Sequence, residues 1–285
     1  MQYRALGRTG QKLSVIGFGG IVVSETTPEE ASRLVSSAVA RGVNYFDVAP
    51  SYGDAEEKLG PALKPHRDAV FLACKTQCRD AEGATAELDA SLKMMHTDHF
   101  DLYQLHAMTK MEDVETVLGP GGALEAFQRA RDAGKVRYLG FSAHSAEAAE
   151  QLLDRFPFDS VLFPLNFATY LEGNFGPQVI AAAQRRGAGV LALKGMARTR
   201  WPEGTAREDR RWKKAWYEPL DDRALASLAL RFTLNLPVTA AIPPGHAELF
   251  DLALDIARDL RPLSNAELAT ITEMAHATEP LFRAA

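Results

Sequence analysis

Short apolar runs alternate with longer segments of helical periodicity along almost the whole chain. Runs rich in β-branched, aromatic and leucine residues predict eight strands, at 14–18, 44–49, 70–75, 100–106, 136–142, 159–163, 188–193 and 238–242. The segments between and after them predict helices, among them 54–63, 82–95, 122–133, 145–155, 175–186, 222–235 and 246–259. Apolar strands separated by helices are typical of a parallel sheet that is covered on its outer face. Eight such units in roughly 250 residues predict an α/β fold of the (β/α)8 TIM-barrel type.

Two further elements flank the barrel units. Residues 3–6 and 13–15 enclose a glycine-containing turn, which predicts an N-terminal β-hairpin that plugs one end of the barrel. The capping-box pattern Ser264–Glu267 predicts an additional C-terminal helix, and a similar pattern at Thr27–Glu30 predicts the start of the first barrel helix. Because no composition shift or flexible linker divides the chain, we expect residues 1–285 to form a single domain.

One long connection, residues 197–218, breaks the alternation of strands and helices. It carries seven basic and four acidic residues, a local charge of +3 in a chain of net charge −5, and it holds all three tryptophans. Loops of this length inside compact domains are usually functional or disordered. Two interpretations follow: a solvated loop that its aromatic residues fasten to the barrel rim, or a lid over an anionic ligand, because the loops after the late strands of such barrels often bind phosphate.

Composition narrows the range of partners. The chain is 46% hydrophobic and 24% charged, as in an ordinary globular protein, and its net charge of −5 provides no basic field for nucleic acid. No apolar run approaches the ~18 residues of a membrane span. Cys74 and Cys78 lie too close together for a disulfide framework, which favours reduced thiols. We therefore expect a cytoplasmic protein with no nucleic-acid and no membrane partner; the sequence makes no prediction of its oligomeric state.

Three of the predicted strands deliver an ionisable residue near their carboxyl ends. Asp47 lies in one of them and is followed five residues later by Tyr52; Lys75 and His106 end two others. In a parallel barrel these ends meet around one mouth, where catalytic groups from separate strands are placed. We therefore expect Asp47, Tyr52, Lys75 and His106 to form one catalytic site.

These four side chains suit the protonation of an oxygen atom. A phenol has a pKa of about 10, a nearby ammonium lowers it, and a carboxylate holds that ammonium charged and oriented. A neutral histidine adds a hydrogen-bond donor that orients a carbonyl oxygen or relays a proton. Protonating the oxygen while the carbon receives a hydride requires a cofactor, since no side chain donates hydride. The alternative from the same residues is a phosphate-binding isomerase or aldolase barrel in which Lys75 is the nucleophile of a Schiff base.

Four ordered motifs carry a resemblance to a known family. They are Tyr3–Gly10 followed by Val15–Gly20, Asn44–Gly53 with its Asp-to-Tyr spacing, Asp101–His106, and Gly134–Ser142. With these motifs the sequence resembles the aldo-keto reductase superfamily over nearly its whole length. The resemblance implies a nicotinamide cofactor, NADPH or NADH, without a metal, and a small-molecule carbonyl or alcohol substrate such as an aldehyde, ketone or sugar. It also allows a second function, a nicotinamide-nucleotide-binding regulatory subunit with little turnover.

The resemblance also implies roles for individual residues. Tyr52 would be the general acid and base, Asp47 and Lys75 would tune it, and His106 would orient the substrate. The residues implied to contact the cofactor are Gly19, Gly20, Ile21, Asp47, Ser142, Asn166, Lys194, Gly195, Met196, Gly245 and His246. The candidates for contact with the substrate are Ser24, Tyr52, His106, Met108, Tyr170 and Trp201.

Three departures from the family pattern concern the cofactor. Ala143 stands where the family commonly has an asparagine, and Leu193 stands where an aromatic residue often stacks on the nicotinamide. The arginine that commonly grips the 2′-phosphate, and a Glu-Asn pair near the adenine, have no counterpart in residues 247–255. His246 or an arginine of the 197–218 connection could replace the missing cation. A 2′-phosphate without a cationic partner would favour the binding of NADH over that of NADPH, or weaken the binding of either nucleotide.

Overall fold

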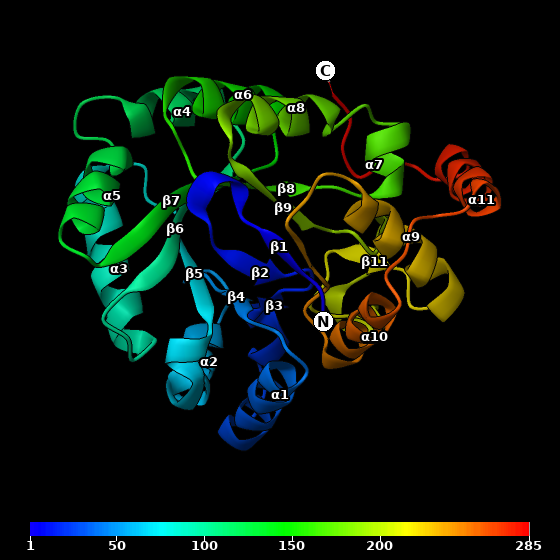
Figure 1. Cartoon of the computed structure of the whole chain (residues 1–285), viewed down its shortest axis with the longest axis horizontal. Helices are drawn as coiled ribbons and strands as arrows, with labels where there is room; N and C mark the ends of the chain where they lie inside the picture. Colours follow the sequence, from blue (N-terminus) through cyan, green and yellow to red (C-terminus); the bar gives the residue numbers. More distant parts are fainter. Residues whose placement is uncertain (285) are drawn as a thin grey trace.

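The computed structural model describes residues 1–284, and in it eight parallel strands form a nearly closed barrel surrounded by helices (Figure 1). The strands are β3 (Phe18–Gly19), β4 (Tyr45–Asp47), β5 (Phe71–Thr76), β6 (Phe100–Met108), β7 (Val136–Ala143), β8 (Ser160–Pro164), β9 (Gly189–Leu193) and β12 (Ala240–Ile242). Each pairs with its neighbour in this order, from β3 to β12. A bridge between Ile16 and Ala241 closes the ring, supported by a 2.9 Å hydrogen bond from Ala241 N to Val15 O. The predicted barrel is confirmed.

Nine of the helices correspond to predicted ones: α1 (Pro28–Ala40), α2 (Ala55–Leu63), α3 (Ala81–Met94), α5 (Ala123–Asp132), α6 (Ala146–Arg155), α8 (Pro177–Arg186), α9 (Arg223–Asn235), α10 (Ala247–Arg258) and α11 (Asn265–His276). Two others, α4 (Met111–Leu118) and α7 (Phe167–Leu171), were not predicted. They are eight and five residues long, too short for helical periodicity to distinguish them from a loop. Among the described residues, no helix has the length and apolar character that a membrane span requires.

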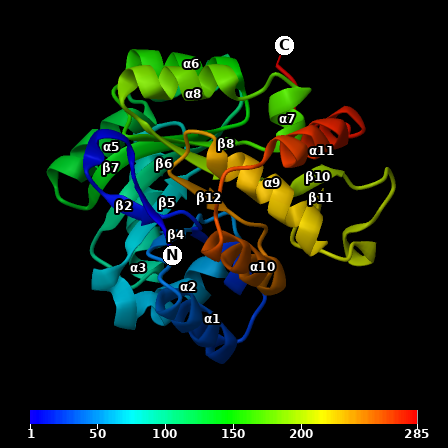
Figure 2. The ribbon, with the colours of Figure 1, turned by 45° about the vertical axis from the view of Figure 1, so that its right-hand side comes forward.

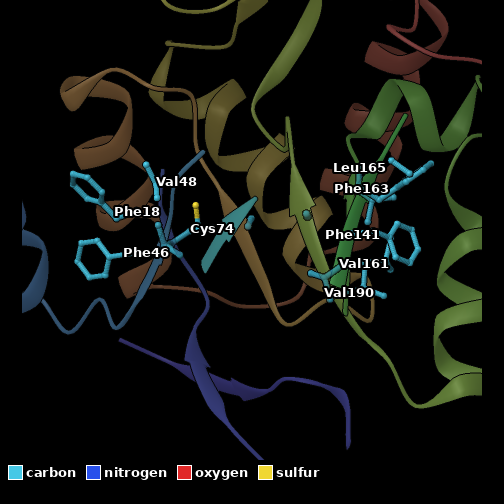
Figure 3. Close-up of a cluster of buried hydrophobic side chains, with 14 of the residues drawn as sticks. Phe18, Phe46, Val48, Cys74, Phe141, Val161, Phe163, Leu165 and Val190 are labelled. Atoms are coloured by element: carbon cyan, nitrogen blue, oxygen red, sulfur yellow. The ribbon is translucent and has the colours of Figure 1, made fainter. Parts of the chain in front are cut away.

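Side chains alternate between two cores along each barrel strand. Outward-facing residues such as Phe46 on β4 and Phe141 on β7 pack under the helices, and Figure 3 shows members of this outer core on both sides of the barrel. Inward-facing residues fill the barrel itself: Leu6, Leu13, Tyr45, Phe71, Ala73, Leu102, Leu162, Leu191 and Ala240. This period of two determines which residues of the next layer face the barrel mouth.

The N-terminal hairpin closes the opposite end of the barrel. Its strands, β1 (Tyr3–Ala5) and β2 (Lys12–Ser14), pair antiparallel across the short 3₁₀ helix η1 (Gly7–Thr9), and Figure 1 shows the hairpin lying across the barrel. Leu6 and Leu13 are fully buried against the inner core. The prediction of a core strand at 14–18 is wrong in its position. Ser14 instead pairs with Tyr3 in the hairpin, so the barrel strand begins later, at Phe18.

Of the two predicted capping boxes, the one at Ser264 forms completely and the one at Thr27 forms only its first hydrogen bond. At Ser264 both hydrogen bonds of the box form, with the Ser264 side chain on Glu267 N and the Glu267 side chain on Ser264 N. At Thr27 the side chain accepts from Glu30 N at 3.2 Å, and Pro28 occupies the first helical position. The carboxylate of Glu30 lies near Arg33, at 3.8 Å, and does not complete the second half of that box.

The 197–218 connection is more ordered than a loop. Its ends form the antiparallel strands β10 (Ala197–Arg200) and β11 (Tyr217–Pro219), and its middle contains the 3₁₀ helix η4 (Arg207–Asp209). Figure 2 shows it projecting beside α9. Its far part returns to the first strand–helix connection, where Arg207 pairs with Glu25 at 2.6 Å.

Lys214 holds the same segment to the barrel mouth. Its ammonium donates to the carbonyl oxygens of Ile21 and Val22, both at 3.3 Å, and to that of Ser24. Ile21 and Val22 belong to the 3₁₀ helix η2 (Gly20–Val23), which follows β3 directly; one further 3₁₀ helix, η3 (Lys64–Ala69), follows α2. Through Lys214 the 197–218 segment is therefore attached to the rim of the barrel mouth next to η2.

We expect the hairpin plug to contribute strongly to stability. Leu13→Ala should lower the free energy of unfolding by about 2–5 kcal/mol, because Leu13 is fully buried in the inner core and the barrel end cannot collapse into the space left behind. Urea denaturation followed by circular dichroism measures the change. Leu268→Ala is the matched control, since Leu268 is 42% exposed on α11 and should cost less than about 0.5 kcal/mol. Equal losses in the two variants would contradict the plug.

Candidate functional site

The inward-facing residues at the carboxyl ends of the strands converge on one cavity of about 250 Å³. Nine of the predicted site residues line it: Gly19, Ile21, Asp47, Tyr52, Lys75, His106, Ser142, Lys194 and Gly245. The strand register brings them together, because β4 aligns Asp47 with Ala73 and β5 aligns Lys75 with Gln104. Two residues beyond Tyr45 and Ala73 of the inner core, the next inward-facing side chains are Asp47 and Lys75. The interior of the barrel therefore changes at this level from apolar to ionisable side chains.

Asp47 and Lys75 form an ion pair inside this layer. The side chains are 2% and 1% exposed, and the Lys75 ammonium donates to Asp47 Oδ1 and, at 3.2 Å, to the carbonyl oxygen of Val48. The other carboxylate oxygen accepts from the Tyr45 hydroxyl at 3.2 Å and from Gln104 Nε2 at 3.0 Å. Burial, the largest single effect, would lower the pKa of Lys75, but the charge and hydrogen bond of Asp47 together with the nearby Tyr52 and Cys74 outweigh it and raise that pKa above its ordinary value.

Tyr52 lies beside this pair. The Lys75 ammonium is 5.0 Å from the centre of the phenol ring, and the ring is perpendicular to that of His106 at 5.8 Å. Burial raises the pKa of Tyr52, and the charge of Lys75 opposes that rise without cancelling it. The sequence-based expectation of a lowered phenol pKa is therefore wrong in its net sign, because burial exceeds the effect of the ammonium. Tyr52 is protonated at neutral pH.

His106 is neutral in this environment. Burial and the positive charges of Lys75, Arg79 and Lys194 lower its pKa to about 3. Its Nδ1 lies 3.3 Å from the hydroxyl of Ser51, which can donate to it and leave the proton of the ring on Nε2. A neutral histidine in that tautomer is a hydrogen-bond donor and not a cation.

Lys194 occupies the cavity wall without an acidic partner. It is 7% exposed, its ammonium lies 3.1 Å from His144 Nε2, and among residues 1–284 no carboxylate forms an ion pair with it. The rings of Trp216 and Phe282 lie 5.4 and 5.7 Å from the ammonium. Burial lowers the pKa of Lys194 to about 7, and burial together with Lys194 lowers the pKa of His144 to about 3.

Gly245 lines the cavity where the connection after β12 approaches the connection after β3. A Cβ atom at Gly245 would lie 2.3 Å from Ile21 Cγ2, so this close approach of two connections requires glycine. Gly245 precedes α10, whose first residues have no side-chain cap from His246. The imidazole of His246 instead accepts a 3.0 Å hydrogen bond from the backbone nitrogen of Lys214.

The remaining predicted site residues lie away from the cavity wall: Gly20, Ser24, Met108, Asn166, Tyr170, Gly195, Met196, Trp201 and His246. Met108 is fully buried in the outer core, and Trp201 donates from Nε1 to the carbonyl oxygen of Ala215. Asn166 caps α7 through a 2.9 Å hydrogen bond from Thr169 N to its Oδ1, while its Nδ2 is buried without a partner. Their predicted contacts stay predictions.

Sequence reasoning missed several residues that shape the site. Gln104 lies two positions before His106, and His144 lies two positions after Ser142, so the alternation along β6 and β7 could have identified both as inward-facing. Tyr45 stands in the same relation to Asp47. Trp216 had no such signal, because its position against the cavity depends on how the β10–β11 segment folds back.

The lack of an acidic partner for Lys194 has a consequence for stability. A lysine with a pKa of 10.5 in the unfolded chain and about 7 in the native state destabilises the fold fully below pH 7, and this penalty disappears as the pH rises toward 10.5. Lys194→Met should therefore raise the melting temperature, by an amount that reflects a few kcal/mol. The increase should be larger at pH 6.5 than at pH 9.5.

Differential scanning calorimetry at the two pH values measures this dependence. Lys93→Met on the exposed face of α3 is the control and should change the melting temperature little at either pH. A Lys194→Met protein that is less stable than the wild type at pH 6.5 would refute the unpaired-charge interpretation.

Comparison with known proteins extends over the same barrel. The model of the aldo/keto reductase family matches residues 15–277 of the chain. L-galactose dehydrogenase from Arabidopsis thaliana is 26% identical over 216 residues, which is 69% of this chain and 66% of that protein. Aldo-keto reductase YhdN from Bacillus subtilis is 32% identical over 185 residues, which is 58% of this chain and 54% of the relative. The chain thus spans less than two thirds of the length of either curated relative.

Solved structures agree in fold. Aldo-keto reductase AKR11C1 from Bacillus halodurans, in its holo form, superposes with a TM-score of 0.75 at 23% identity, over 99% of this chain and 98% of that one. At this identity the likeness concerns the fold. Because the family model covers nearly the whole chain, from before the first barrel strand to the end of α11, the chain belongs to the aldo/keto reductase family of oxidoreductases.

Proposed function

We propose that the protein is an NAD(P)H-dependent oxidoreductase that interconverts an aldehyde, ketone or sugar carbonyl with its alcohol, with Tyr52 as the general acid and base. One observation carries the proposal: the Lys75 ammonium lies between the Asp47 carboxylate and the Tyr52 ring at the wall of a cavity that His106 also lines. The free thiols of Cys74 and Cys78 accord with a cytoplasmic location for this activity.

In the reduction, Tyr52 donates its proton to the carbonyl oxygen. The raised pKa keeps the phenol protonated at neutral pH, and the Lys75 ammonium stabilises the phenolate that the transfer leaves. Asp47 keeps that ammonium in position, and His106, as a neutral donor, orients the same oxygen. In the oxidation, the Tyr52 phenolate accepts the proton of the alcohol, so the same residue serves both directions of the reaction.

The residues of the cavity fit a nicotinamide dinucleotide. When bound, this cofactor supplies the hydride that the carbonyl carbon receives. Gly19 and Ser142 line the cavity together with the tetrad, and Asn166, which the resemblance implies as a cofactor contact, has a buried Nδ2 without a hydrogen-bond partner. Gly245 and the free backbone N–H groups at the start of α10 suit a phosphate group.

The ordered 197–218 segment supports its interpretation as a lid. Lys214 and Trp216 line the cavity, and Lys214 joins the segment to η2 on the opposite side of the mouth. A cofactor that enters between them would be covered by this segment, which would exclude water from the reacting groups.

The Schiff-base alternative loses its support. A lysine nucleophile must be an unprotonated amine that is free to approach a carbonyl carbon. Lys75 is bound to Asp47 and Val48, and its pKa is raised. It is the least available amine of the cavity.

Replacing the proposed acid tests the mechanism. Tyr52→Phe should lower kcat for carbonyl reduction by about 10²–10⁴-fold, because the oxygen loses its positioned proton donor, while the Kd of the cofactor changes little. Steady-state kinetics with a panel of aldehydes and calorimetric titration of the cofactor measure the two quantities.

Tyr217→Phe is the matched control. Tyr217 lines the same cavity, but no ammonium lies beside its ring, so its loss should leave kcat within a few-fold. Equal turnover of the wild type and Tyr52→Phe would rule out the mechanism. A wild-type protein that binds the cofactor and turns over no carbonyl would favour the regulatory subunit.

The charges around α10 predict the ranking of the two nucleotides. Glu248 and Asp251 stand near the start of the helix, and the one cation that contacts Asp251, Arg41, also pairs with Asp255. The described residues place no unpaired arginine there, and the ammonium of Lys214, the lysine beside His246, already donates to three backbone carbonyl oxygens, so we expect NADH to bind at least as tightly as NADPH. Because Trp216 lines the cavity, quenching of its fluorescence reports both titrations.

Two variants check this readout. Trp216→Phe should remove most of the quenching, whereas Trp201→Phe should retain it, because Trp201 lies off the cavity wall. NADPH binding more than tenfold tighter than NADH would contradict the charge argument and would indicate a cation supplied by the 197–218 segment.

A further inference from the structure

Lys194 is a buried cation that the proposed chemistry does not use. Its side chain lines the cavity, is 7% exposed, and has His144 as its hydrogen-bond partner in place of a carboxylate. Burying an unpaired ammonium is costly, and proteins ordinarily pair such a charge or let it coordinate a ligand. The cavity itself is thus the place from which a counter-ion for Lys194 would come.

The backbone of Lys194 is also unusual. Its φ of +65° lies in the left-handed region, which residues other than glycine, asparagine and aspartate seldom occupy. Such conformations cost free energy and persist where the surrounding structure enforces them, often at functional sites. Here the result is a lysine side chain directed across the mouth toward His144, at the end of β7.

The anion is expected on the substrate side of the cavity. Lys194 lowers the pKa of His106 and of His144, so its charge lies near the catalytic histidine. The phosphate-binding features proposed for the cofactor, Gly245 and the start of α10, lie instead beside Lys214, whose charge acts on His246. The two lysines therefore lie beside different lining residues, Lys194 beside His144 and Lys214 beside His246.

We propose that Lys194, held on His144 beside the rings of Trp216 and Phe282, binds the carboxylate of the substrate, so that the enzyme acts on carbonyl compounds that also carry a carboxylate. This inference rests on the proposed function and reassigns Lys194 from the cofactor contact that the sequence implies. The carboxylate is unchanged in the reaction: the carbonyl carbon gains a hydride, and the oxygen gains a proton from Tyr52. The ammonium donates to one carboxylate oxygen, and the Trp216 ring, which lines the cavity and is backed by Phe282, packs against the carbon chain or ring behind it.

A pair of matched aldehydes tests the charge requirement. 4-Carboxybenzaldehyde and methyl 4-formylbenzoate share their ring and the position of the carbonyl group, and only the first carries an anion. The wild type should prefer the acid over the ester in kcat/KM, and Lys194→Met should lower the ratio of the two values by about 10- to 100-fold, mainly through KM for the acid. Lys93→Met, on the exposed face of α3, is the control and should keep the ratio within about twofold.

Direct binding separates this inference from the proposed function. Calorimetric titration with benzoate, in the absence and presence of NADH, should detect binding to the wild type that is at least tenfold weaker in Lys194→Met. The same variant should change the Kd of NADH by less than about threefold. In Tyr52→Phe, reduction should be lost and benzoate binding retained.

The outcomes are distinct. An acid-to-ester ratio near one in the wild type, or an unchanged ratio in Lys194→Met, would overturn the inference. A tenfold loss of NADH affinity in Lys194→Met with the ratio preserved would also overturn it, because the oxyanion would then be the pyrophosphate of the cofactor. If the wild type reduced neither aldehyde, the proposed function would fail, and benzoate binding that depends on Lys194 would still support an anion site.

Discussion

The side chains of Asp47 and Lys75 form an ion pair inside the barrel, where they are only 2% and 1% exposed to water. Removing two charges from water costs several kcal/mol for each ion, and their attraction offsets this cost only if the remaining polar atoms are also satisfied. Here the Tyr45 hydroxyl, the Gln104 amide and the Val48 carbonyl supply those contacts. Because they come from β4, β6 and the turn after β4, the ion pair requires the register of neighbouring strands, and that register places Tyr52 and His106 beside it.

The barrel mouth contains a second buried lysine with the opposite electrostatics. Lys75 has a carboxylate partner and a raised pKa, whereas Lys194 has a neutral histidine and a pKa lowered to about 7. Both are nearly inaccessible to water, so the difference comes from the partner and not from depth. A paired lysine has its charge fixed by the fold, while an unpaired one is stabilised only when something else brings an anion. One lysine can therefore be built into the catalytic machinery, and the other can respond to a ligand.

The sequence predicts the barrel and its catalytic layer for the same physical reason. The period of two along each strand determines which side chains face inward, and the carboxyl ends of parallel strands converge. Asp47, Lys75 and His106 therefore meet even if the boundaries of the helices are predicted inaccurately. Sequence signals of this kind depend on neighbouring residues, and they do not identify short helices or predict where a folded-back segment will lie. The helix α7 has five residues and begins at Asn166, and Trp216 reaches the cavity only because β10 and β11 pair. The predicted direction of the Tyr52 pKa shift was wrong because burial, which raises this pKa, depends on the whole fold.

This division between local and long-range information separates chemistry from specificity. The proposed proton donor and its tuning pair are positioned by strand ends and the turn that follows β4, which any barrel of this order brings together. The side chains that would select a substrate depend on three distant parts of the chain. His144 after β7 and Trp216 in the folded-back segment line the cavity, and Phe282 near the C-terminus packs on His144 at 5.5 Å and supports both. Substitutions in these segments leave the strand register intact, because none of them lies in the eight-stranded sheet. The barrel can therefore change the compounds that it accepts without disturbing the ion pair on which the proposed proton transfer depends.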